Sequence, residues 1–152
     1  MTEWCVHARC GRELGLSQKA VRTTDLLIDA PYIVSRAAPQ FNFEFPPSAR
    51  RTQDWIVDCP RAGVKAFHNQ LGSEATIAAI IHLGLAGTQR EYDPESRFLG
   101  TAITSQISDR LDKLSNISGI SKELETAGEI LETNGAVDDV LQSGASSFDY
   151  DT

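Results

Sequence analysis

The chain has 152 residues, of which 41% are hydrophobic and 23% charged, and its formal net charge is −7. A chain of this length and composition forms one ordinary domain with a sizeable core. These values exclude a large multidomain enzyme and an intrinsically disordered polar tract.

Charge divides the chain into two halves. Residues 1–72 hold nine Lys and Arg against seven Asp and Glu, a net charge of +2, whereas residues 73–152 hold five against fourteen, a net charge of −9. Like charges repel over a Debye length of about 8 to 10 Å. An anionic ligand such as nucleic acid is therefore expected to bind only the first half.

The first predicted elements are two helices joined by a tight turn. Residues 8–14 can form a short helix that stops at Gly15. Ser17 is a good N-cap residue, and the apolar pattern that follows predicts a helix of about 12 residues up to Ala30, before Pro31 ends it.

Two short strands are predicted near residues 40–59. Residues 40–45 alternate polar and apolar side chains, which places Phe41, Phe43 and Phe45 on one face until Pro46 and Pro47. In residues 54–59 the side chains at positions 55, 57 and 59 share a side. We expect the phenylalanine face to lie in the core; the alternative is an aromatic edge strand that receives a partner.

Two helices are predicted next. Apolar side chains at spacings of three and four predict a helix over residues 60–71, closed by Gly72. Ser73 is then expected to cap a strongly apolar helix that runs through Leu85, and we expect this helix to be central to the core. His82 on this helix is expected to be a hydrogen-bonded core histidine.

The last structured part is predicted to be a helical hairpin over residues 98–133. Asp93-Pro94-Glu95 is a good helix start, Gly119 interrupts the apolar stripe, and a helix from Ser121 stops near Asn134-Gly135. Each piece holds only about two heptads, so we expect the hairpin to pack on the core; the alternative is an oligomer or partner interface. The residues of that interface would be Ile103, Ile107, Leu111, Leu114, Leu124 and Leu131.

The predicted fold is therefore a mainly α single domain over residues 1–142, with the short two-stranded element and the C-terminal hairpin. Residues 143–152 are small and acidic, and we expect a flexible tail. No run of about 18 apolar residues occurs, so no membrane partner is expected. The chain does not begin with a basic and apolar leader, and we expect a cytoplasmic location or one within a virion.

Residues 11–22 resemble the helix-turn-helix signature of bacterial and phage regulators. Gly11 is a small residue four positions before the turn residue Gly15, Ser17 opens the next helix, and Val21 is apolar six positions after the turn. The small residue lets the helices cross closely, the glycine allows the turn, and Val21 seals the crossing.

This resemblance, which covers residues 8–24, implies that the helix from Ser17 is a recognition helix. Gln18, Lys19 and Arg22 would then face the major groove of double-stranded DNA, where Gln pairs with adenine and Arg or Lys with guanine or phosphate. The chain departs from the family at Thr24, where an apolar residue is usual. The residues before Ala8 are also too few for the usual preceding helix.

A second resemblance is to the ribbon-helix-helix regulators, whose unit is a strand, a helix and a second helix with a Ser cap. Residues 53–59, 60–71 and 73–86 follow that order. The strand face that would meet the bases carries Asp54, Ile56 and Asp58, and carboxylates oppose phosphate.

The potential soft metal ligands gather near the N-terminus. Cys5, His7 and Cys10 lie within six residues, and Cys59 with His68 could complete a tetrahedral zinc site. The C-x4-C spacing is looser than that of zinc knuckles, so we expect buried or idle thiols, no metal and no other cofactor.

Enzyme signatures such as GxxxxGK[ST], GxGxxG, HExxH and GxSxG are missing from the sequence. We therefore expect a non-catalytic binding protein without catalytic residues. Its most concrete form is a small DNA-binding regulator that acts as a self-associated oligomer. The alternative is an assembly or adaptor protein, or a viral or mobile-element structural protein, that binds partners through its aromatic strand and striped helices.

Overall fold

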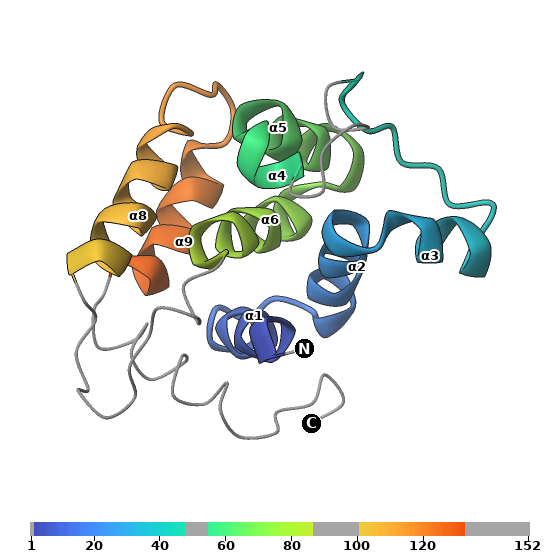
Figure 1. Ribbon diagram of the computed structural model, residues 1–152, viewed down its shortest axis with the longest axis horizontal. Helices are drawn as coiled ribbons and strands as arrows, with labels where there is room; N and C mark the ends of the chain where they lie inside the picture. Colours follow the sequence, from blue (N-terminus) through green and yellow to red (C-terminus); the bar gives the residue numbers. More distant parts are fainter. Residues whose placement is uncertain (1, 48–54, 87–100, 133–152) are drawn as a thin grey trace.

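The computed structural model describes residues 2–47, 55–86 and 101–132, and within these ranges the chain is helical and forms no strand (Figure 1). The predicted mainly α class is confirmed. None of the described helices has both the length and the apolar content to cross a membrane. The helices are α1 (Thr2–Glu13), α2 (Gln18–Asp29), α3 (Pro31–Ala37), α4 (Trp55–Asp58), α5 (Pro60–Leu71), α6 (Ser73–Leu85), α8 (Thr101–Asp112) and α9 (Ser121–Leu131).

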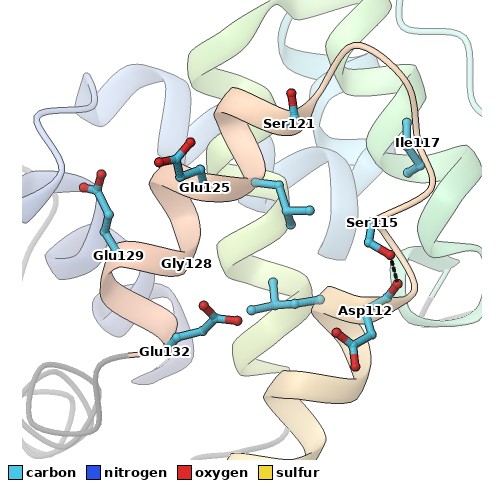
Figure 2. Close-up of a pocket in the computed structure, with 10 residues that line it drawn as sticks. Asp112, Ser115, Ile117, Ser121, Glu125, Gly128, Glu129 and Glu132 are labelled. Atoms are coloured by element: carbon cyan, nitrogen blue, oxygen red, sulfur yellow. Dashed lines mark hydrogen bonds between the residues drawn. The ribbon is translucent and has the colours of Figure 1, made fainter.

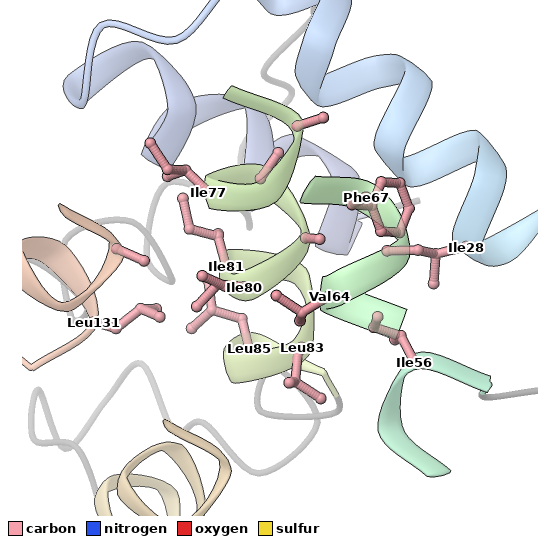
Figure 3. Close-up of a cluster of buried hydrophobic side chains, with 14 of the residues drawn as sticks. Ile28, Ile56, Val64, Phe67, Ile77, Ile80, Ile81, Leu83, Leu85 and Leu131 are labelled. Carbon is pink, nitrogen blue, oxygen red and sulfur yellow. The ribbon is translucent and has the colours of Figure 1, made fainter. Parts of the chain in front are cut away.

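Helix α6 is the centre of the fold, as its apolar sequence predicts. It contacts α1, α2, α5, α8 and α9, and every residue from Ala75 to Leu85 is buried. Figure 3 shows isoleucines and leucines of α6 meeting Val64 and Phe67 of α5 on one side and Leu131 of α9 on another. Burial of each such side chain contributes about 1.5 to 3 kcal/mol, so α6 organises the core.

The first three helices follow from local signals. Helix α2 has the predicted length, but α1 begins at Thr2 rather than Ala8, so the first helix is longer than expected. Pro31 ends α2 as predicted and also begins α3, since proline suits the first helical position, where no backbone N–H is needed.

The predicted two-stranded element is wrong. Residues 55–58 form the helical turn α4, and residues 41–45 are irregular. The side chain of Gln70 accepts the Glu44 N–H at 2.7 Å and donates to the Glu44 carbonyl at 2.8 Å. The Gln70 side chain therefore satisfies the backbone N–H and carbonyl of Glu44, which a neighbouring strand would otherwise have bonded.

The phenylalanines of this segment still face the core, as expected. Phe43 is buried, with its ring centroid 5.1 Å from that of Phe67, and Phe45 meets Trp55 edge-on at 5.4 Å. Because these rings pack within the chain, they do not form an exposed aromatic edge. Helix α4 also occupies the place of the strand that the ribbon-helix-helix resemblance requires.

The C-terminal hairpin packs on the core. Helices α8 and α9 both contact α6, and the turn between them contains Gly119 with φ of +88°. The interface residues proposed for an oligomer lie inside the chain's own core, with only Leu124 half-buried. The buried ones are Ile103, Ile107, Leu111, Leu114 and Leu131. The predicted helix start at residues 93–95 and the tail at residues 143–152 lie outside the described residues.

Candidate functional site

The segment that resembles a helix-turn-helix unit folds as two helices joined by a tight turn. Gly15 has φ of +77°, a conformation that side-chain-bearing residues rarely adopt. The Ser17 hydroxyl accepts the Ala20 N–H at 3.2 Å and so caps the N-terminus of α2. Leu16 between them is buried, which fixes the turn against the core.

The two helices cross in contact at Gly11 and Val21. A Cβ atom added to Gly11 would lie 2.6 Å from Val21 Cγ2, closer than any real side chain allows. Val21 itself is 2% exposed. The close crossing predicted from the small residue is therefore confirmed as local geometry.

The three predicted DNA-contacting residues are placed differently. Lys19 and Arg22 are exposed on the outer face of α2. Gln18 instead turns back toward α1, where its amide Nε2 donates to the Ala8 carbonyl at 3.4 Å and its Oε1 is buried. A side chain held in this way does not face outward, so Gln18 does not join the other two.

The carboxylate of Glu74 lies beside the N-terminus of α2. Glu74 accepts the Ser17 N–H at 2.9 Å, which puts a negative charge beside the helix N-terminus. An anion at the N-terminus of α2 would meet this carboxylate, although Lys19 lies in the same first turn and Arg22 one turn further along.

An acidic groove lies on the other side of the molecule from α2. A groove of about 550 Å³ between α8 and α9 is surrounded by the carboxylates of Asp112, Glu125, Glu129 and Glu132 (Figure 2). Figure 1 shows α8 and α9 on one side of α6 and α2 on the other. The carboxylates of the α8–α9 groove therefore do not lie next to the outer face of α2.

A buried polar cluster ties α1, α2 and α6 together. His7 of α1 and His82 of α6 both direct Nδ1 at the same carboxylate oxygen, Asp25 Oδ1 of α2, at 2.9 and 2.8 Å. Each of the three residues is at most 4% exposed. The expectation that His82 is a hydrogen-bonded core histidine is confirmed, and its partner is a carboxylate.

A second carboxylate holds the other side of the His82 ring. His82 Nε2 lies 3.4 Å from Asp29 Oδ1, and the indole N–H of Trp4 donates to Asp29 Oδ2 at 2.5 Å. His7 differs, because its Nε2 is buried without a hydrogen-bond partner among the described residues.

The cluster shifts the protonation of its members. Burial alone raises the pKa of Asp25, but the charge of His7 and the hydrogen bonds from both histidines outweigh burial and lower it. Burial alone lowers the pKa of His82, but the hydrogen bonds and charges of Asp25 and Asp29 raise it to about 9. The pKa of Asp29 is also lowered, against burial, chiefly by its hydrogen bond with His82.

The candidate zinc ligands named from the sequence do not come together as one group. All three cysteines are free thiols, and His7 joins Asp25 and His82 instead of Cys5, Cys10 or Cys59. Burial, foremost, raises the pKa of the Cys10 thiol far above its ordinary value, which keeps it protonated. His68 Nε2 lies 3.9 Å from Glu123 Oε1, so His68 is next to a carboxylate.

The sequence alone does not identify Asp25 as a member of a site, and it does not show that His7, Asp25 and His82 come together. The available signal is that Asp25 falls on the face of α2 that also holds Val21 and Ile28, where a carboxylate needs a buried partner.

The chain matches no family model, no curated protein and no solved structure.

Proposed function

We propose that the chain is a small DNA-binding regulator whose α1–turn–α2 unit contacts the duplex through Lys19 and Arg22. The observation that carries this proposal is the contact crossing of α1 and α2 at Gly11 and Val21. It rigidly presents a capped helix whose outer face exposes two cationic side chains. This is the arrangement by which a helix-turn-helix unit enters the major groove.

The chemistry of the two side chains suits a nucleic acid. Arg22 can donate two hydrogen bonds to a guanine edge or to a phosphate, and Lys19 can neutralise a phosphate. Gln18 is left out of the proposed contact because its side chain turns back to α1.

Charge separation within the fold supports the same orientation. The hairpin of α8 and α9 carries the carboxylates of the groove and lies across α6 from α2. A duplex against α2 would keep its phosphates away from that acidic surface, which would otherwise repel them.

The test is a binding titration of fluorescently labelled duplex DNA, followed by anisotropy at several salt concentrations. The double substitution Lys19→Ala with Arg22→Ala should weaken binding to all sequences. It should also reduce the slope of log K against log salt by about 2, because each phosphate contact contributes about 1.

The matched control is Lys113→Ala with Lys122→Ala, which removes the same charge from exposed sites on the hairpin. This variant should bind DNA as the unaltered chain does. Equal losses in both variants would mean that only net charge matters, and absence of binding at low salt would contradict the proposal.

The second candidate is an adaptor that binds a protein partner, or a second copy of the chain, through α3. Tyr32 and Ile33 are large hydrophobic side chains that are 62% and 41% exposed. The aromatic segment and the apolar stripes of α8 and α9 are buried, so α3 carries this candidate. Substitution of Tyr32→Ser and Ile33→Ser should then lower the molar mass in light scattering; a wild-type chain that is monomeric at high concentration excludes self-association through α3.

A further inference from the structure

Three donor atoms from three helices meet at one buried point of the structure. His7 Nδ1, Asp25 Oδ1 and His82 Nδ1 come from α1, α2 and α6, and the potential ligand atoms of these residues lie within 4.8 Å of one another. All three residues are buried, so water does not compete freely for these atoms. In the ion-free chain these atoms are held together by hydrogen bonds to the Asp25 carboxylate, and a metal ion would take the place of the hydrogen-bond protons, because metal ligands bind in their deprotonated form.

The separations suit a metal ion. Two ligands that each lie about 2.1 Å from an ion, at right angles, are about 3.0 Å apart. The two Nδ1–Oδ1 distances of 2.9 and 2.8 Å are close to this value, and because the ligand atoms as a group lie within 4.8 Å of one another, the two histidines would draw together around an ion.

The surroundings of His82 also match those of a metal-bound histidine. A histidine that binds a metal through one ring nitrogen commonly donates its other N–H to a carboxylate, which fixes the ring orientation and the tautomer. Asp29 stands in that position, 3.4 Å from His82 Nε2, and Trp4 in turn holds Asp29. Loss of the Nδ1 proton on metal binding would leave the Nε2 proton directed at Asp29 and make the Nδ1 lone pair available to the ion.

We propose that His7, Asp25 and His82 bind a single divalent transition-metal ion, the histidines through Nδ1 and the aspartate through Oδ1. Asp29 is the positioning residue for His82. Two imidazoles and one carboxylate form a donor set that suits iron(II), cobalt(II), nickel(II) or zinc(II) and disfavours the all-oxygen ions calcium and magnesium. The ion would fasten α1 and α2 to α6, independently of whether α2 contacts DNA.

The test is equilibrium dialysis of the full chain, first stripped with a chelator, against Co²⁺, Ni²⁺ and Zn²⁺ in turn. Bound metal is measured by elemental analysis. The wild-type chain should take up one ion per molecule, and His82→Gln and Asp25→Asn should each abolish this uptake. Asp29→Asn should weaken the affinity by about 10- to 100-fold, since it leaves the ligands in place but loosens their support.

The matched control is His68→Ala, because His68 is a partly exposed histidine of α5 outside the cluster. It should bind the metal as the wild type does. No uptake by folded wild-type chain overturns the proposal, and so does unchanged uptake in folded His82→Gln or Asp25→Asn, which would place the ion on surface carboxylates.

A second measurement needs no substitution and therefore does not depend on the variants folding. The chain has three histidines, so their ring protons can be followed by NMR. Addition of paramagnetic Co²⁺ should shift the ring resonances of His7 and His82 strongly and those of His68 far less. Equal shifts of all three, or none, overturn the proposal.

Discussion

The side chain of Val21 fills the space that a Cβ atom on Gly11 would need. The distance between that Cβ position and Val21 Cγ2 is 2.6 Å, and Val21 is 2% exposed, so it has little room to move away. The crossing of α1 and α2 therefore depends on the absence of a side chain at position 11.

Gly11→Ala should destabilise the protein by up to about 2 kcal/mol. Alanine favours a helix over glycine by about 1 kcal/mol, but overpacking of a tight contact costs about 1 to 3 kcal/mol, and the backbone must shift to relieve this one. Urea unfolding followed by circular dichroism measures the change.

Gly128→Ala is the matched control. Its Cβ atom would meet only the end of the flexible Glu132 side chain, at 3.3 Å, so the helix preference should prevail and stability should rise by up to about 1 kcal/mol. A Gly11→Ala variant that is as stable as Gly128→Ala would show that the crossing is not tight.

Arg110 should contribute strongly to the packing of α8 on α6. Its Nη1 atom donates to the carbonyls of Leu83 and Ala86 at 3.0 and 2.6 Å, at the C-terminal end of α6. The Leu83 carbonyl also accepts the Ala86 N–H at 3.4 Å, and a cation there meets the negative end of the helix dipole.

Arg110→Met keeps much of the side-chain volume but removes the donors, and it should cost about 1.5 to 3 kcal/mol. Lys113→Met, at an exposed position one turn away, should change stability by less than about 0.5 kcal/mol. Chemical denaturation compares them, and equal effects of the two substitutions would speak against the Arg110 contact.

Helices with strong local signals were predictable from the sequence. Ser17 and Gly15 set the start of α2, Pro60 and Gly72 bound α5, and the apolar run of α6 marks its central burial. In α2 the Ser17 cap, the apolar pattern and the stop before Pro31 agree with one another. In α6 the predicted cap is wrong, because Gly72 is the N-cap and Ser73 the first helical residue, and the central position follows from apolar content alone.

The strand prediction failed because alternation does not by itself supply a pairing partner. Phe41, Phe43 and Phe45 alternate with polar residues, but the backbone of Glu44 is satisfied by Gln70, which lies 26 residues further along. A contact between residues so far apart in the sequence cannot be predicted from the local pattern of apolar and polar residues.

The buried cluster of His7, Asp25 and His82 could not be predicted from the sequence for the same reason. His7 and Asp25 are 18 residues apart and Asp25 and His82 are 57 residues apart, so only the packing of α1, α2 and α6 brings them together. The sequence showed Asp25 on an apolar helix face, which indicates a buried partner without naming it.

Cys10 should be unreactive toward thiol reagents in the native protein. It is completely buried, and burial raises the pKa of its thiol so far that the reactive thiolate does not form near neutral pH. Cys5 and Cys59 are partly exposed, so both should react before Cys10.

Labelling of the native chain with iodoacetamide, followed by mass spectrometry of peptides, measures each cysteine separately. Cys10 should become labelled only when denaturant is added. Labelling of Cys10 at the rate of Cys59 in the native state would show that α1 opens readily.

Asp25 should be the most sensitive polar position of the core in the metal-free chain. Asp25→Asn removes one of the two carboxylates that raise the pKa of His82 to about 9, and it takes from His7 and His82 the negative charge that they share as a buried partner. Removal of one member of a buried ion pair costs about 3 to 5 kcal/mol, and we expect a loss of this size.

The double variant Asp25→Asn with His82→Gln isolates the pair, since neither remaining side chain carries a charge. Its destabilisation should fall short of the sum of the single losses by about 0.5 to 3 kcal/mol, the usual range for residues in contact. Urea unfolding in the presence of a chelator gives all three values. Strict additivity would mean that His82 and Asp25 act separately in holding α6 to α2, despite the 2.8 Å between their atoms.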